Sequence, residues 1–214
     1  MNRRIAKALA LTVGMALLGT SLSACAPLVL GGAAMSALVA TDRRTSGAQL
    51  EDEGIELRAA GRIRENLGDR AHVNVTSYNR QVLLSGEVPS AQDRQLVEQI
   101  VSRVENVRSI VNELAVSGNT SLTQRSSDAL ITGRVKAAMV DAKDLFANSF
   151  KVVTERGTTY LMGRVTQREA NRATELTRRT GGVQKVVRVL EIISEEELQR
   201  TLPQPAPAAA APKT

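Results

Sequence analysis

Side chains that could carry out chemistry are few in this chain and far apart. The chain has one cysteine, Cys25, and one histidine, His72. A zinc site of the usual kind needs several Cys or His residues, and the chain offers one of each, far apart in the sequence, so the sequence predicts no metal site and no catalytic Cys–His pair. The acidic runs at residues 51–53 and 195–197, and His72, are interpreted as solvated. Without a glycine-rich phosphate loop either, the sequence predicts no enzymatic activity, no catalytic residue, no cofactor and no small-molecule substrate.

The N-terminus has the pattern of a bacterial export signal. A basic stretch at residues 3–7 precedes an apolar stretch at residues 8–18, which is too short to span a bilayer. The run LSAC that ends at Cys25 resembles the lipoprotein processing box, in which the thiol is acylated and the chain is cut before the cysteine. Residues 1–24 are therefore predicted to be a signal peptide and Cys25 the lipidated residue. An ordinary signal peptide with an incidental cysteine is the alternative.

The residues after Cys25 bear on where the anchored chain resides. Ala26 stands where inner-membrane lipoproteins carry aspartate, so the resemblance implies the outer membrane, with the protein facing the periplasm. Each buried methylene of the acyl chains adds about 0.8 kcal/mol of membrane affinity, which makes such an anchor effectively permanent. Residues 26–40 are rich in Gly and Ala; they either lie against the bilayer or form a tether, and the tether is favoured.

The chain contains one pattern twice. The run VLLSGEV at residues 82–88 returns as TYLMGRV at residues 159–165, an offset of 77 residues. Each copy follows a helical stretch and a short β-rich run, and each precedes a helix and a Val-rich run. A unit of about 60 residues with the order helix, strand, strand, helix, strand therefore occurs in tandem.

Composition changes mark the boundaries of the two units. The first module is expected at residues 55–116 and the second at residues 125–194, with a linker at residues 117–124 between them. A lipidated N-terminus and tether (residues 25–54) precede them, and a disordered Pro/Ala-rich tail (residues 195–214) follows. Thr166 and Glu169 form a capping box, which predicts that a helix begins there.

The two copies differ in length and in charge. Their first helices align at an offset of 72, with Gly61 on Gly133 and Ile63 on Val135, which predicts five additional residues before the first strand of the second module. The first module carries as many acidic as basic side chains, whereas residues 125–193 carry thirteen basic and seven acidic ones. A basic module on a lipid-anchored protein favours an anionic partner; a charge that only keeps the domain soluble is the alternative. Nucleic acid is disfavoured because the chain is exported.

The strand and turn residues identify the modules as similar to the BON domain. The pattern in the second module is Val152, Thr154, Gly157, Leu161, Gly163 and Val165, followed by Gly182, Val183 and Val186. In the first module it is Val75, Ser77, Val82, Leu84, Gly86 and Val88, followed by Val107 and Ile110. Arg80 replaces the turn glycine there, so Asn79 is expected to take positive φ.

Two such modules behind a processing box resemble the dual-BON outer-membrane lipoproteins of the DolP type. The resemblance implies an α+β fold, in which each αββαβ module packs a three-stranded sheet against two helices. It also implies binding of anionic, phosphatidylglycerol-like phospholipid through the second BON domain, and a role in outer-membrane integrity and at the division site. Outer-membrane assembly or division proteins are further expected partners. The alternative is a periplasmic interaction scaffold for envelope assembly or cell-wall remodelling.

The lipid-facing element is expected to be the first helix of the second module. A helix that lies on a membrane needs exposed apolar side chains flanked by cations. The expected lipid-binding residues are Leu130, Gly133, Arg134, Lys136, Ala137, Val140 and Lys143. For Leu130 and Val140, ordinary core packing is the alternative.

Overall fold

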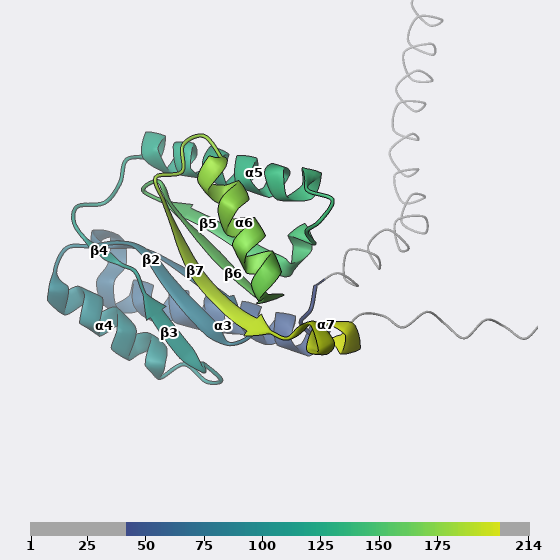
Figure 1. Cartoon of the computed structure of the whole chain (residues 1–214). Helices are drawn as coiled ribbons and strands as arrows, with labels where there is room; N and C mark the ends of the chain where they lie inside the picture. The colour runs from purple at the N-terminus through teal and green to yellow at the C-terminus, as the bar shows by residue number, and fades with distance from the viewer. Residues whose placement is uncertain (1–41, 202–214) are drawn as a thin grey trace, which may run out of the picture. The chain divides into compact units, whose positions relative to one another are not determined.

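Two α+β modules with the same topology follow one another in the chain (Figure 1). The computed structural model describes residues 42–201, so Cys25, the expected tether and the end of the tail lie outside the described residues. The first module contains α3 (Ser46–Leu67), η2 (Gly68–Arg70), β1 (His72–Tyr78), β2 (Gln81–Val88), α4 (Ala91–Ser102), β3 (Ser109–Asn112) and β4 (Ala115–Val116). The second contains α5 (Leu122–Asp141), η3 (Ala147–Ser149), β5 (Phe150–Glu155), β6 (Thr158–Thr166), α6 (Gln167–Arg179) and β7 (Lys185–Ile193), and α7 (Glu195–Thr201) follows it. The predicted α+β fold and order of elements are confirmed.

The central strand of each sheet is the one that carries the repeated motif. β2 pairs antiparallel with β1 and parallel with β3 and β4, and β6 pairs in the same way with β5 and β7. Parallel neighbours need a crossover connection, which α4 and α6 supply. The third strand of the first module is interrupted between β3 and β4, but the N–H of Glu113 still donates to the Leu84 carbonyl at 2.9 Å, so the ladder continues across the gap.

Helices cover only one face of each sheet, and the uncovered faces pack against one another. Each module has its own core between its helices and its sheet. A third cluster joins the modules: Leu83 of β2 lies with Tyr160 and Met162 of β6, all at most 5% exposed. Figure 1 accordingly shows α5 and α6 on one side of the sheets and α3 and α4 on the other. The described residues therefore form helix, sheet, sheet and helix layers.

Two helices begin earlier than the sequence predicted, and one further helix forms in the predicted tail. α3 begins at Ser46, capped by the Thr45 hydroxyl, which accepts from the Ala48 N–H at 3.1 Å. Residues 46–54 are thus helical, and their assignment to the tether is wrong. α5 likewise begins within the predicted linker, and α7 forms where disorder was expected, with Leu198 only 4% exposed. Polar first turns resemble linkers in sequence, because their charges serve the helix terminus and solvent.

The predicted five-residue insertion in the second module is wrong. The buried stripe of α3 begins with Asp52 and Ile55, and that of α5 begins with Asp128 and Ile131. Equivalent residues of the two helices are therefore 76 positions apart. The strands match at 77, so the second module has one additional residue between its first helix and first strand. A shift of four residues is close to one helical turn and leaves apolar residues on the same stripe, so periodicity alone does not distinguish offsets of 72 and 76.

A buried carboxylate on the first helix of each module binds the hairpin turn. Asp52 accepts hydrogen bonds from the N–H groups of Asn79 and Arg80, both at 2.8 Å. These two residues have φ of 51° and 64°, so the expected positive φ at Asn79 is confirmed. The interpretation of Asp52 as solvated is wrong, since it is 1% exposed. Burial by itself raises the pKa of Asp52, but hydrogen bonds from Arg80, Ser77 and Arg44 outweigh it and lower the pKa.

Candidate functional site

The outer face of α5 is the candidate membrane-binding surface. The helix lies on the outside of the second module, as Figure 1 shows, and presents Asp128, Ile131, Val135 and Met139 to the core. Its remaining surface faces away from the sheet. Among the described residues, no helix is both long enough and apolar enough to span a bilayer.

The structure brings the predicted lipid-binding residues together on this outer face. All seven are solvent-exposed. Leu130 is 63% and Val140 69% exposed, which excludes core packing as the explanation of these two side chains. Leu130, Gly133, Ala137 and Val140 follow spacings of three, four and three residues, so they share one stripe of the helix. Arg134 and Lys136 lie on either side of that stripe, and Lys143 follows the helix.

Two further large apolar side chains are exposed, one on α5 and one in the loop after it, and the sequence analysis missed both. Leu122, the first residue of α5, is 78% exposed, and Phe146 in the following loop is 49% exposed. With Leu130 and Val140 they account for four of the eight large hydrophobic residues that are exposed in the described part of the chain. Leu122 had been assigned to the linker. Its position directly after Ser121, a potential N-cap, is the signal that would have placed it on the helix.

The cations on α5 are largely free to meet an external anion. Within the described residues, neither Lys136 nor Lys143 forms an ion pair, and Arg134 donates only a long hydrogen bond, 3.5 Å, to the Gly181 carbonyl. On α6, by contrast, Arg172 pairs with Asp144 at 2.8 Å and Arg179 with Glu175 at 2.5 Å. The apolar face of α5 is therefore bordered by positive charge that the protein itself does not neutralise.

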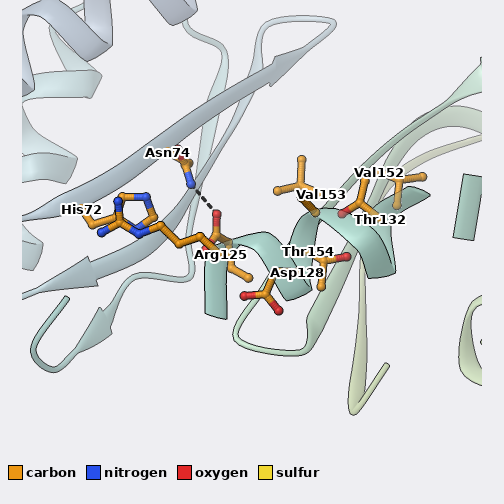
Figure 2. Close-up of a pocket in the computed structure, with 10 residues that line it drawn as sticks. His72, Asn74, Arg125, Asp128, Thr132, Val152, Val153 and Thr154 are labelled. Carbon is orange, nitrogen blue, oxygen red and sulfur yellow. Dashed lines mark hydrogen bonds between the residues drawn. The ribbon is translucent and has the colours of Figure 1, made fainter. Parts of the chain in front are cut away.

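A second polar site lies where the two modules meet. Here a cavity of about 390 Å³ is lined by residues of both modules, among them His72, Asn74, Arg125, Asp128 and Glu155. Figure 2 shows Asn74 of the first module and Asp128 and Thr154 of the second around it. The prediction that His72 is solvated is wrong, because its side chain is 18% exposed and its Nδ1 lies 3.0 Å from Glu87 Oε2. Residues of α5 such as Asp128 and Thr132 line the cavity, but none of the predicted lipid-binding residues does.

Comparison with known proteins identifies the modules. The family model of the BON domain matches the chain twice, at residues 52–118 and 127–194. The chain is 37% identical over 174 residues to the outer membrane lipoprotein DolP of Haemophilus influenzae, an alignment that covers 80% of this chain and 90% of that protein. This chain belongs to the BON-domain family, as a dual-BON lipoprotein of the DolP type.

Other relatives are more distant. The 21 kDa hemolysin of Actinobacillus pleuropneumoniae is 31% identical over 154 residues, which span 71% of this chain and 79% of that protein. Neither of these two relatives is named as an enzyme. A solved structure of CdsD, a structural protein of the type III secretion system of Chlamydia trachomatis, has 13% identity and a TM-score of 0.29 over 66% of this chain and 95% of that one.

Proposed function

We propose that this chain is a non-enzymatic outer-membrane lipoprotein, anchored at Cys25 and facing the periplasm, that binds anionic phospholipid through α5. The proposed ligand is a phosphatidylglycerol-like headgroup, and the proposed role is support of outer-membrane integrity, including at the division site. The name of the DolP relative supports the location. The proposed contact residues are Leu130, Gly133, Arg134, Lys136, Ala137, Val140 and Lys143.

The observation that carries this proposal is the exposure of Leu130 and Val140 on a helix whose other face is fully committed to the core. Apolar area removed from water contributes about 25 cal/mol per Å², so a few partly buried side chains contribute a few kcal/mol at most. Each Lys or Arg near an anionic surface adds about 1 kcal/mol, and salt screens it. Such a surface binds weakly and reversibly, which suits a protein that an acyl anchor already holds at the membrane.

Vesicle binding tests the proposal. The chain from residue 25 with Cys25→Ser, which lacks the anchor, is mixed with vesicles of zwitterionic lipid alone or with added phosphatidylglycerol. Both modules are retained, because an isolated second module would expose Tyr160 and Met162 of the inter-module cluster. Binding is expected only with the anionic lipid, and it is expected to weaken with salt.

Matched charge reversals locate the surface. Arg134→Glu with Lys136→Glu is expected to abolish binding, whereas Arg64→Glu with Arg103→Glu, an equal charge change at exposed positions of the first module, is expected to preserve it. Equal loss in both variants would show that net charge, and not α5, is responsible. Equal binding to both vesicle types, or no binding, would contradict the lipid proposal and favour an interaction scaffold for envelope assembly or cell-wall remodelling.

A further inference from the structure

Three metal-ligating side chains from the two modules meet at one point. His72 opens β1, Glu87 lies opposite it on β2, and Glu155 ends β5 of the second module. One ligand atom from each lies within 4.8 Å of the other two. The three side chains are separated by up to 83 positions in the chain, so only the packing of one sheet on the other brings them together.

The Glu87 carboxylate is buried with half of its hydrogen-bonding capacity unused. The residue is 0% exposed. Its Oε2 lies 3.0 Å from His72 Nδ1 and accepts from the Thr120 N–H and hydroxyl at 3.3 and 3.2 Å. Its Oε1 has no hydrogen-bond partner among the described residues. Buried carboxylate oxygens without a partner are rare because desolvation costs free energy, so each one calls for a physical explanation.

The third side chain, Glu155, faces the same point from the second module. It is half-buried, and the Asn74 amide donates to its Oε1. Burial raises the pKa of the Glu155 carboxyl, against the lowering effect of His72 and Asn74. Two carboxylates thus lie close together in a poorly solvated junction. Among the residues that the structure describes, Arg125 is the only Lys or Arg that lines the cavity beside them. One guanidinium beside two carboxylates leaves one negative charge without a Lys or Arg counter-charge in the lining of the cavity.

We propose that His72, Glu87 and Glu155 bind a divalent transition-metal ion of the Zn²⁺ type at the junction of the two modules. One imidazole nitrogen and two carboxylate oxygens are ligands that Zn²⁺ accepts in its tetrahedral sites. Ligand atoms around a tetrahedral Zn²⁺ lie about 3.4 Å apart, so small rotations of side chains now within 4.8 Å suffice. The adjoining cavity has room for a water as the fourth ligand.

The ion would act as a structural clamp between the modules. Two of its ligands come from the β1–β2 pair of the first module and one from β5 of the second. Binding would therefore oppose separation of the two sheets. The free energy of metal binding would add to the free energy needed to separate the modules. The sequence predicted no metal site because the usual zinc sites contain several Cys or His residues. That argument does not apply to a site with one histidine and two glutamates.

Calorimetric titration tests the site in the chain from residue 25 with Cys25→Ser, made without a histidine tag because a thiol or a tag would itself bind zinc. One Zn²⁺ per chain is expected, with a Kd below about 10 µM. At a hundredfold excess over Kd the melting temperature should rise by at least ~3 °C. Mg²⁺, which prefers six oxygen ligands, is expected not to bind.

Two variants and one spectroscopic signal identify the ligands. Glu155→Gln, which retains the contact with Asn74, should weaken Zn²⁺ binding at least tenfold, and so should His72→Ala. The control is Glu191→Gln: Glu191 accepts hydrogen bonds from Asn79 and Arg108 between the same two modules, and its replacement should leave Zn²⁺ binding unchanged. Since His72 is the only histidine, the Hε1 proton of its ring gives one NMR resonance, whose chemical shift should change when Zn²⁺ is added at constant pH. Absence of binding, binding unchanged by both variants, or a His72 resonance that Zn²⁺ does not shift would each overturn the proposal.

Discussion

Arg43 and Glu169 form a bidentate ion pair that ties the segment before α3 to the second module. Arg43 Nη2 lies 2.7 Å from Glu169 Oε1 and Nη1 2.8 Å from Oε2, and the two side chains are 5% and 1% exposed. The Glu169 Oε2 atom also accepts from the Thr166 N–H at 3.0 Å, which completes the capping box of α6. Burial by itself raises the pKa of Glu169, but its hydrogen bonds with Arg43 and Thr166 outweigh it and lower the pKa. One carboxylate therefore begins a helix and joins two distant parts of the chain.

Arg43→Ala is expected to destabilise the protein by about 3–5 kcal/mol, because it leaves the buried Glu169 carboxylate without its counter-charge. Urea unfolding measures this. The control is Arg43→Met with Glu169→Gln, which removes both charges and should recover most of the loss. If the single and double variants lose equal stability, the charge pair is not the cause.

Local signals in the sequence predicted most of the secondary structure. Thr166 and Glu169 predicted the start of α6, and the capping box is present. Ser90 begins α4 through its hydroxyl, which accepts from the Asp93 N–H at 3.1 Å. These features depend on residues three positions apart, so they are readable without knowledge of the fold.

Features that depend on distant residues could not be predicted in the same way. The partner of Glu169 is Arg43, 126 positions earlier, and no local pattern connects the two. The packing of the two sheets did leave a signal: Val82, Leu83 and Leu84 are consecutive apolar residues, as in strands buried on both faces. The exposure of Leu130 and Val140 on the outside of α5 could be anticipated, because a helix face with apolar residues beside cations is itself a local pattern. Lipid binding by that face stays a prediction.

The turn-binding aspartates are expected to contribute unequally. Asp128 accepts from the Arg156 and Gly157 N–H groups at 2.8 and 2.9 Å, and Asp128→Ala should cost about 1–3 kcal/mol by leaving them unpaired. Asp52→Ala should cost more, because it also removes the partner of Arg44, 2.8 Å away. Chemical denaturation compares the two. Asp141→Ala, at an exposed end of α5, should change stability by less than about 0.5 kcal/mol.

Both tyrosines are expected to resist ionisation while the modules remain packed together. Burial between the sheets raises the pKa of Tyr78 and of Tyr160 to about 12. Because unfolded tyrosines ionise near pH 10, the free energy of unfolding should fall as the pH rises from about 10 to 12. The chain has only these two tyrosines, so absorbance at the phenolate band reports on both. A native protein that titrates near pH 10, as the urea-unfolded chain should, would contradict burial of this cluster.

The motif glycines of β2 and β6 are expected to be irreplaceable because of the neighbouring strand. A Cβ on Gly86 would lie 2.1 Å from the His72 carbonyl oxygen, at a φ of +108°, and one on Gly163 would lie 2.5 Å from the Ser149 carbonyl oxygen. Backbone cannot yield as a side chain can, so Gly86→Ala and Gly163→Ala should each cost about 3 kcal/mol or more, with Gly86 the worse of the two. Gly133→Ala is the matched control: nothing lies within 4 Å of its Cβ position, and replacing a mid-helix glycine should stabilise α5 by about 0.5–1 kcal/mol. In thermal unfolding, the melting temperature should fall for Gly86→Ala and Gly163→Ala and rise for Gly133→Ala. A lower melting temperature for Gly133→Ala would show that another part of the folded protein covers the outer face of α5.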